Sequence, residues 1–587
     1  MPAATSPDRD LQAIWITDNT LSLRSRSQAR LRFEIEYGLE RGTTSNSYLI
    51  RGERTILINP PGASFTDAFL AALEQRQPID KIDYVLLGHL NPNRITTLKA
   101  LRRRSRTFSV VCSNPGARIL QTLWEAAEDE EPLPPLCLDV VRGEQTLDLG
   151  NGHQLTLIPT PTPRWPGGLA AFDNRTRLLF SDKLFGAHLW GDQVADEGWP
   201  LFVEDQRYYF DALMAPQWRQ IARALERFSD LPLGAIAPSH GPIARYGLTE
   251  LLRHYREWGA RVEQQDLRVA LLYASAYGST AAIGQAIAQG ISKSGVQVES
   301  INCESASDND IRQALGDCDG FVIGSPTLGG HAPTPIQTAL GTILEVADRN
   351  RLAGVFGSYG WSGEAIDLLE GKLRDGGFRF GFEPIRVQFK ADARTLKACE
   401  EAGTDFAQLL RRQKQKAERA SRPTLGDSQS EATEQAVGRL LGSLSILTAR
   451  KGEVSSAMLA SWISQASFDP PGLTVAVARD RAVEDLTHKG ERFVINLLAE
   501  GRSLGLMKHF LKPFAPGEDR FAGVDLVDDV ETSAPVLRDS LAWLQCRVSD
   551  RMECGDHWLV YATIEDGNLL DGDGRTATHH RTNGRFY

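Results

Sequence analysis

The sequence lacks a membrane-spanning run, an export signal and an excess of positive charge. No apolar stretch approaches the roughly 18 residues that cross a bilayer, so no membrane span is expected. The first residues, MPAATSPDRDLQ, hold acidic side chains and no apolar core, which argues against a signal peptide. The formal net charge of −10 disfavours nucleic acid and anionic membranes as partners.

Cysteine is scarce, and its pattern excludes the usual cysteine-based sites. The seven cysteines form no C-x-x-C pair and no metal-type spacing. They predict reduced, mostly buried thiols in a cytoplasmic protein. With 42% hydrophobic and 24% charged residues in 587, the chain has an ordinary globular composition and room for about three domains.

The clearest functional pattern lies mid-chain, at residues 268–280 (RVALLYASAYGST). An apolar strand breaks into a hydroxyl-rich turn, and Ile283, Ile287 and Ile291 then recur at helical spacing. Backbone N–H groups and hydroxyls at a helix N-terminus bind phosphate without Lys or Arg. The loop has neither a Gly-Lys-Ser/Thr triplet nor G-x-G-x-x-G, which points to a monophosphate.

Two later strands run into similar loops: residues 320–326 end in SPTLGGHAP, and residues 352–357 end in GSYGWSGEA. In a parallel sheet all three loops meet at the carboxyl edge, where α/β sheets bind ligands. Together the segments resemble flavodoxin, which implies FMN bound by three loops. The implied FMN residues are Ser275, Tyr277, Gly278, Ser279, Thr280, Pro326, Thr327, Leu328, Gly330, Ser358, Tyr359, Gly360, Trp361 and Gly363.

The N-terminal segment alternates short strands with helices and places GHLNPNRIT, TPTPRWPGG, SDKLFG and PSHGP after strands. It resembles the metallo-β-lactamase-like domain of flavodiiron proteins, whose His, Glu and Asp ligands hold two irons. By that resemblance His89, Asp182 and His240 occupy three metal-ligand positions. Asn91, Asn93, Arg94 and Arg164 stand where the family has Glu, Asp and two His.

These four departures predict a site without stable iron. Arginine stays protonated and has no lone pair for a metal, and a neutral Asn is a weak ligand. Two ferrous ions and three carboxylates leave the family's site with a charge of about +1. Asp182 with Arg94 and Arg164 also gives +1, so we hypothesise that the two arginines replace the charge of the irons around a cavity for water or an anion. Paired structural histidines are the alternative for His89 and His240.

The C-terminal third follows a polar linker and shows closely spaced β-rich runs, which suggest a small barrel. ASWISQASFDPP and ECGDHWLVYATI resemble the flavin-reductase family. The resemblance implies a second flavin, FMN or FAD, held by Ser461, Trp462 and Ser467. It also places His557 of the G-D-H triplet near flavin and nicotinamide. No fingerprint distinguishes NADH from NADPH.

The predicted fold is therefore an αββα metallo-β-lactamase-like sandwich (1–260), a doubly wound flavodoxin-like sheet (261–410), a linker (411–435) and a split β-barrel (436–587). This order resembles the three-domain flavodiiron proteins of oxygenic phototrophs. The resemblance implies an enzyme that passes electrons from NAD(P)H through two flavins to O2, forming water, as a photoprotective, Mehler-like electron sink. A regulatory or electron-transfer subunit without O2 chemistry of its own is the alternative.

The same resemblance implies head-to-tail assembly, in which the FMN of one subunit faces the metal site of the next. A homodimer would aim FMN at metal-poor sites, whereas a heteromer with a complete-site paralogue would reduce the paralogue's irons. Arg94, Arg164 and His557 are the candidate catalytic residues. A metallo-hydrolase is disfavoured because the missing ligands would also be needed for zinc.

Overall fold

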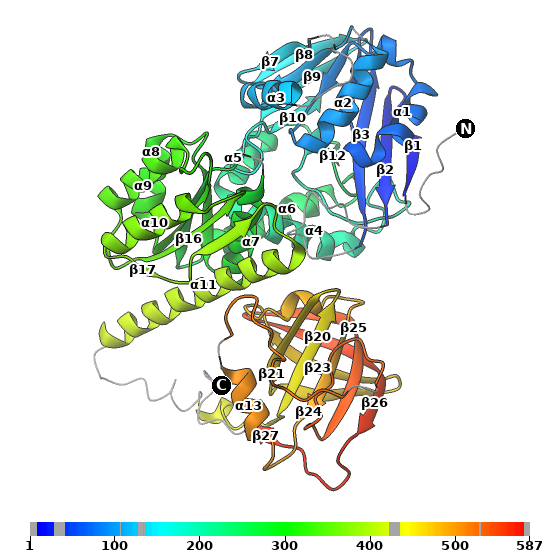
Figure 1. The fold of residues 1–587 in the computed structure, drawn as a ribbon. Helices are drawn as coiled ribbons and strands as arrows, with labels where there is room; N and C mark the ends of the chain where they lie inside the picture. The colour runs from blue at the N-terminus through cyan, green and yellow to red at the C-terminus, as the bar shows by residue number, and fades with distance from the viewer. Residues whose placement is uncertain are drawn as a thin grey trace. The chain divides into compact units, whose positions relative to one another are not determined.

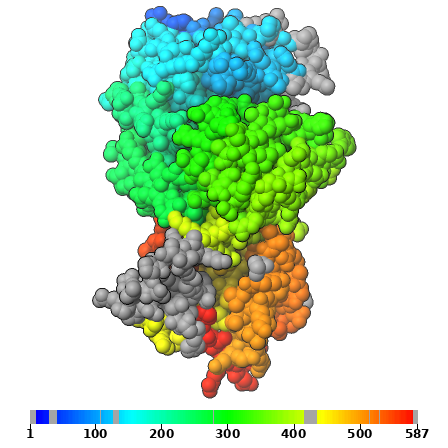
Figure 2. All heavy atoms as spheres, turned by 90° about the vertical axis from the view of Figure 1, so that its left-hand side faces the viewer, coloured from blue at the N-terminus to red at the C-terminus, as the bar shows by residue number. Residues whose placement is uncertain are grey.

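The structure is a computed structural model of the chain. It describes residues 9–28, 41–105, 107–126, 133, 135–276, 278–421, 435–512, 514–527 and 530–579, and the remaining residues are grey in Figure 1 and Figure 2. The chain divides into two compact units, Met1–Asp266 with Gln297–Ala314, and Leu267–Val296 with Leu315–Tyr587.

The first unit contains two sheets. The larger runs β1 (Arg9–Trp15), β2 (Thr20–Ser27), β3 (Thr43–Arg51), β4 (Thr55–Ile58), β5 (Tyr84–Leu86), β6 (Ser109–Ser113) and β7 (Cys137–Val141) in that spatial order. The smaller runs β12 (Ala235–Pro238), β11 (Leu178–Asp182), β10 (Leu169–Asp173), β9 (His153–Pro159) and β8 (Gln145–Gly150).

Helices cover the outer faces of these sheets, which makes the unit an αββα sandwich (Figure 1). The larger sheet packs against α1 (Thr66–Glu74), α2 (Pro92–Arg104) and α3 (Asn114–Ala126). The smaller packs against α4 (Val203–Tyr209), α5 (Trp218–Ser229) and α6 (Leu248–Glu263). Helix α5 shows the reason, because its apolar residues Trp218, Ile221, Leu225 and Phe228 share one buried face. Between the sheets, residues such as Tyr48 and Phe180 form a common core with ring centroids 5.1 Å apart.

The second unit begins with a parallel sheet. Strands β13 (Arg268–Tyr273), β15 (Gly320–Pro326), β16 (Leu352–Tyr359) and β17 (Arg379–Phe380) are neighbours in that order, and β18 (Ile385–Gln388) also pairs with β16. The accompanying helices are α7 (Ser279–Lys293), α9 (Thr334–Val346), α10 (Glu364–Asp375) and α11 (Ala393–Ser421). Between α7 and β15 the chain also forms β14 (Gln297–Asn302) and α8 (Asp308–Asp317).

A seven-stranded antiparallel sheet follows and encloses its own apolar core. Its order is β21 (Val454–Ala460), β20 (Ser445–Lys451), β24 (Arg492–Leu497), β25 (Ala542–Cys554), β26 (His557–Leu569), β23 (Pro471–Ala478) and β22 (Ile463–Phe468). Helix α13 (Leu504–Leu511) and the short pair β19 (Gly442–Ser443) and β27 (Thr578–His579) complete the segment.

The predicted fold class is confirmed. Helix α11 continues to Ser421, so the predicted linker from residue 411 begins as helix. The predicted boundaries at 260, 410 and 435 stay predictions. None of the described helices is both long and apolar enough to cross a bilayer.

Candidate functional sites

A cavity of about 540 Å³ opens at the carboxyl edge of the parallel sheet. Most of its lining comes from the three predicted loops, because β13, β15 and β16 run parallel and end together. The predicted residues that line it are Ser279, Thr280, Pro326, Thr327, Leu328, Gly330, Ser358, Tyr359, Gly360 and Trp361. Tyr277 lies outside the described residues.

The loop after β13 has the form of a phosphate-binding turn. Gly278 precedes helix α7 with a φ of 83°, a left-handed conformation that glycine adopts without strain. The Ala281 N–H donates to the Ser275 hydroxyl at 3.1 Å, and the hydroxyls of Thr280 and Ser358 are 2.8 Å apart. The loop thus offers polar groups at a 15-residue helix's N-terminus.

The other two loops leave groups open toward the cavity. The hydroxyl of Thr327 is buried and has no hydrogen-bond partner among the described residues, and a ligand in the cavity would supply one. A Cβ atom at Gly329 or Gly330 would meet nothing within 4 Å, so the backbone is open to a ligand there. Trp361, at 92% exposure, stands at the rim, while Gly363 caps helix α10. These residues fit FMN.

A fourth loop, not predicted from the sequence, also lines the cavity. Strand β18 pairs with β16 so that Gln388 lies opposite Tyr359, and Phe389 and Lys390 follow directly. The Phe389 N–H donates to the Tyr359 carbonyl at 2.7 Å, and the rings of Phe389 and Trp361 meet edge to face at 6.1 Å. Strand β18 is only four residues long and half polar, which is why the sequence pattern did not reveal it.

In the first unit, the predicted ligand position His89 follows β5 of the larger sheet, Asp182 ends β11 of the smaller sheet, and the two side chains are hydrogen-bonded to each other. The His89 Nδ1–H donates to the Asp182 carboxylate at 2.7 Å. The Ser239 hydroxyl donates to the same carboxylate at 2.7 Å, and Arg94 Nη2 lies 3.8 Å from it. Asp182, His89 and Arg94 are all buried. The carboxylate is therefore occupied on several sides by protein groups.

Burial, together with the nearby positive charges of Arg94 and Lys183, lowers the pKa of His89 to about 4, although Asp182 opposes the shift. His89 is therefore neutral at pH 7. Burial alone would raise the pKa of Asp182, but the hydrogen bond from His89 and the nearby charges of Arg94 and Lys183 outweigh burial and hold that pKa below its ordinary value. Because His89 is uncharged, Arg94 and Lys183 are the cations that keep Asp182 ionised at neutral pH.

Lys183 also belongs to this site, although it was not predicted from the sequence. Its Nζ donates to His240 Nε2 at 2.8 Å, while the His240 Nδ1–H donates to the Thr44 carbonyl at 2.6 Å. Both ring nitrogens of His240 are thus engaged, and the nitrogen that could face a metal accepts from an ammonium group. His188, also missed, packs on His240 with ring centroids 4.4 Å apart.

The remaining altered positions have local structural roles. Asn91 caps helix α2, since its side chain accepts from the Arg94 N–H at 3.1 Å, and Asn93 is exposed on the first turn. The Arg164 guanidinium lies 5.3 Å from the Trp165 ring, and Lys183 Nζ lies 5.7 Å from the same ring. Arg164 and Lys183 therefore both contact the ring of Trp165.

In the C-terminal sheet, the predicted residues Trp462 and His557 come together with ring centroids 5.0 Å apart. Gly555 and Asp556 form the turn between β25 and β26, and Asp556 accepts from His557 Nδ1 at 2.8 Å. The Ser461 hydroxyl is buried without a hydrogen-bond partner among the described residues.

The third predicted contact, Ser467, lies 3.1 Å from the Tyr561 hydroxyl and donates to the Pro470 carbonyl at 2.6 Å. The orphaned Ser461 hydroxyl beside exposed Trp462 fits a bound ring system at this end of β22.

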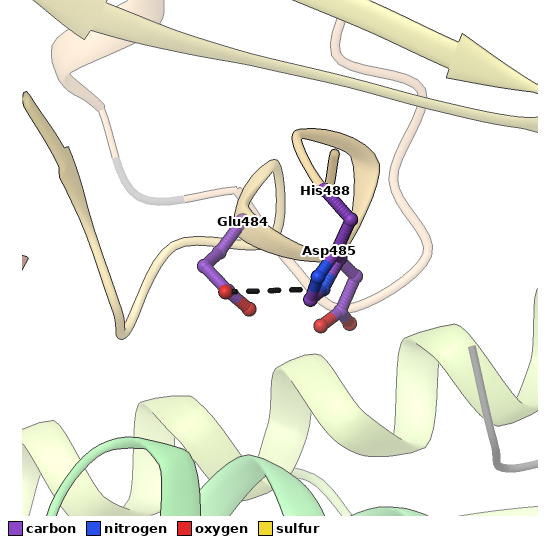
Figure 3. A group of neighbouring side chains, drawn as sticks. All are labelled: Glu484, Asp485 and His488. Carbon is purple, nitrogen blue, oxygen red and sulfur yellow. Dashed lines mark ion pairs between the residues drawn. The ribbon is translucent and has the colours of Figure 1, made fainter. Parts of the chain in front are cut away.

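One further cluster, Glu484, Asp485 and His488, brings carboxylate and imidazole groups together in the second unit (Figure 3). Its acids are already paired, Asp485 with Lys397 at 2.5 Å and Glu484 with Arg551 at 2.9 Å. Burial raises the pKa of Glu484, against the attraction of Arg551. We interpret the cluster as a buried ion-pair network and not as a metal site.

Comparison with known proteins agrees with this geometry. Family models match in order: an ODP family beta lactamase over residues 43–241, a flavodoxin over 271–403 and a flavin reductase like domain over 437–586. This arrangement defines a three-domain flavodiiron oxidoreductase, a class that takes electrons through flavins and reduces O2 or NO.

Relatives then narrow the class. The chain is 57% identical to a putative diflavin flavoprotein A 6 of Nostoc sp., over 99% of both chains, and 56% identical to a putative diflavin flavoprotein A 3 of Synechocystis sp., over 100% of this chain and 97% of the relative. A metal-soaked Flv1 flavodiiron core from Synechocystis sp. is 54% identical, covering 69% of this chain and 100% of that one, with a TM-score of 0.67. The chain belongs to the diflavin flavoprotein A family.

Proposed function

We propose that this chain collects electrons from NAD(P)H on its C-terminal flavin, passes them to FMN in the flavodoxin-type cavity, and delivers them to a partner subunit that carries a complete di-iron site. O2 reduction to water takes place in that partner. The observation that carries the proposal is the contrast between an open flavin cavity and a ligand site whose remaining ligands are engaged by Arg94, Lys183 and Ser239.

The polar groups and aromatic side chains that line the flavodoxin-type cavity support the proposed binding of FMN. Bound FMN would supply the step from a two-electron hydride donor to single electrons. The chain's own part is to hold the phosphate at the N-terminus of α7 and to place Tyr359 and Trp361 beside the ring. At the other flavin, Trp462 and His557 would orient the nicotinamide and flavin rings.

The di-iron end does not fit iron. Asp182 provides one carboxylate where the family has three, and His240 Nε2 already accepts from Lys183. A metal would have to displace an ammonium from His240 and approach Asp182 past the guanidinium of Arg94. Lys183 adds a second positive charge to that of Arg94 beside Asp182, which makes the site still less favourable for a cation. No step of the proposal passes through this site.

A regulatory subunit is the second candidate, favoured by the same engaged ligands. Two measurements separate the candidates. The pure chain should oxidise NAD(P)H with an artificial acceptor and consume O2 slowly, and mixing with a complete-site relative should raise O2 consumption. A complex without a rate gain would favour regulation, and no complex at all would overturn the heteromeric assembly.

Metal analysis provides an independent test. We expect the wild-type chain, prepared anaerobically with ferrous iron, to hold far less than two irons. A variant with N91E, N93D, R94H and R164H together restores the family's ligand types and should bind more iron. Two irons in the wild-type chain would overturn the proposal.

A further inference from the structure

Among the described residues that line the flavodoxin-type cavity, Lys390 is the charged one. The others are small, hydroxylic or aromatic, and the described part of the phosphate loop contains no Lys or Arg. Lys390 is exposed at the rim, next to Phe389, whose side chain is 57% exposed. A positive charge at the rim interacts more favourably with an anionic ligand group than with a neutral one.

Lys390 belongs to the end of the cavity away from the phosphate loop. The loop follows β13, whereas Lys390 follows β18, and the sheet places β15 and β16 between them. Three strand spacings of about 4.8 Å separate the two by on the order of 14 Å. The Gln388 side chain donates to the Gly360 carbonyl at 3.1 Å, which ties this segment to the loop of Tyr359 and Trp361.

The backbone fixes that placement. Phe389 has a φ of 55°, a left-handed conformation that is rare for an aromatic residue. Its N–H donates to the Tyr359 carbonyl at 2.7 Å, and its ring meets Trp361 edge to face. The chain therefore turns sharply after β18, and Lys390 follows beside the two aromatic side chains.

We infer that the positive charge of Lys390 makes the bound flavin easier to reduce. The inference rests on the proposed FMN site. Two electrons and one proton convert oxidised, neutral flavin into a reduced anion whose charge lies on the N1 and C2=O edge of the ring. Charge near that edge tunes flavin electronics. A lysine at the ring end stabilises the anion more than the neutral ring, so the reduction potential rises.

The test is the Lys390→Gln substitution in the full chain, with flavin potentials measured spectroscopically against reference dyes during slow dithionite reduction. The preference for reduced over oxidised FMN should fall by about threefold to tenfold, and tenfold corresponds to about 30 mV for a two-electron couple. Lys390→Arg should keep the potential. Raising the salt concentration should shrink the difference, because the charge is exposed.

Lys372→Gln is the matched control, because it removes one positive charge as Lys390→Gln does. Lys372 is exposed in the last turn of α10. Equal shifts from both substitutions, or none from Lys390→Gln, would overturn the inference while leaving the FMN site intact. Loss of oxidised FMN on Lys390→Gln would also overturn it, because the lysine would then hold the phosphate. A chain that binds no FMN would overturn the proposed site as well.

Discussion

Replacing Asp182 by Asn would remove one buried negative charge while keeping the side chain's shape. Asn can still accept from Ser239, but it leaves Arg94 without a counter-ion in a position where the Arg94 side chain is 5% exposed. Lys183 loses the same neighbouring charge. The perturbation therefore tests whether the chain's own cations depend on this carboxylate.

The size of the effect follows from the geometry. At 3.8 Å and an effective dielectric of 20, the gross attraction between Arg94 and Asp182 is about 4 kcal/mol, before desolvation is counted. Removing one partner of a buried pair commonly costs about 3–5 kcal/mol, because the other charge stays buried and uncompensated. For a unit of this size, that corresponds to a fall of about 10 °C in its melting temperature.

Differential scanning calorimetry of the full chain is the assay, with D192N as the control. Asp192 also pairs with an arginine, Arg26 at 2.6 Å, but its side chain is 81% exposed, so its loss should cost less than about 1 kcal/mol. If D182N lowers the transition no more than D192N, or if ferrous iron strongly stabilises the wild-type chain and not D182N, charge replacement at this site is wrong.

Three further outcomes are expected. The free energy of unfolding of the first unit should fall by about 3 kcal/mol between about pH 6.5 and pH 4. The reason is that His89 takes up a proton in this range in the unfolded chain but not in the folded chain, where its pKa is lowered to about 4. Urea unfolding at a series of pH values should show this loss in the wild-type chain and not in H89N. G278V should release FMN from the central site, since a β-branched residue is strained at a φ of 83°, whereas G341A on helix α9 should retain it; flavin stoichiometry decides, and an unchanged value would contradict the predicted phosphate loop. W462A should slow NAD(P)H oxidation with a dye about tenfold by removing the ring beside His557, with central FMN retained, and an unchanged rate would place the nicotinamide elsewhere.

Much of the fold could be predicted because apolar runs carry the signal for buried strands. The predicted strand at residues 320–326 is β15 to the residue. Helix α11 extends into the predicted linker because Gln, Lys, Ala, Glu and Arg are good helix formers even without an apolar face. Composition indicated exposure there and could not indicate where the helix ends.

The sites were less visible, because they depend on contacts between distant residues. Lys183 follows Asp182 directly, yet its role depends on His240, 57 residues further on. Lys390 gains its place from the pairing of β18 with β16, which no local pattern encodes. The three flavin loops could be predicted to meet because parallel strands end at one edge, whereas side-chain contacts such as that of Lys183 with His240 could not be predicted.

The ammonium of Lys183 on His240 also changes what the first unit needs from its surroundings. A bound metal stabilises a protein by mass action, so the stabilisation rises and falls with the free metal concentration. A lysine side chain is joined to the fold by covalent bonds, and its concentration at the site is fixed by synthesis of the chain. A chelator has nothing to withdraw from that contact, and under the proposed function we expect this unit to fold without a maturation step that delivers a cation.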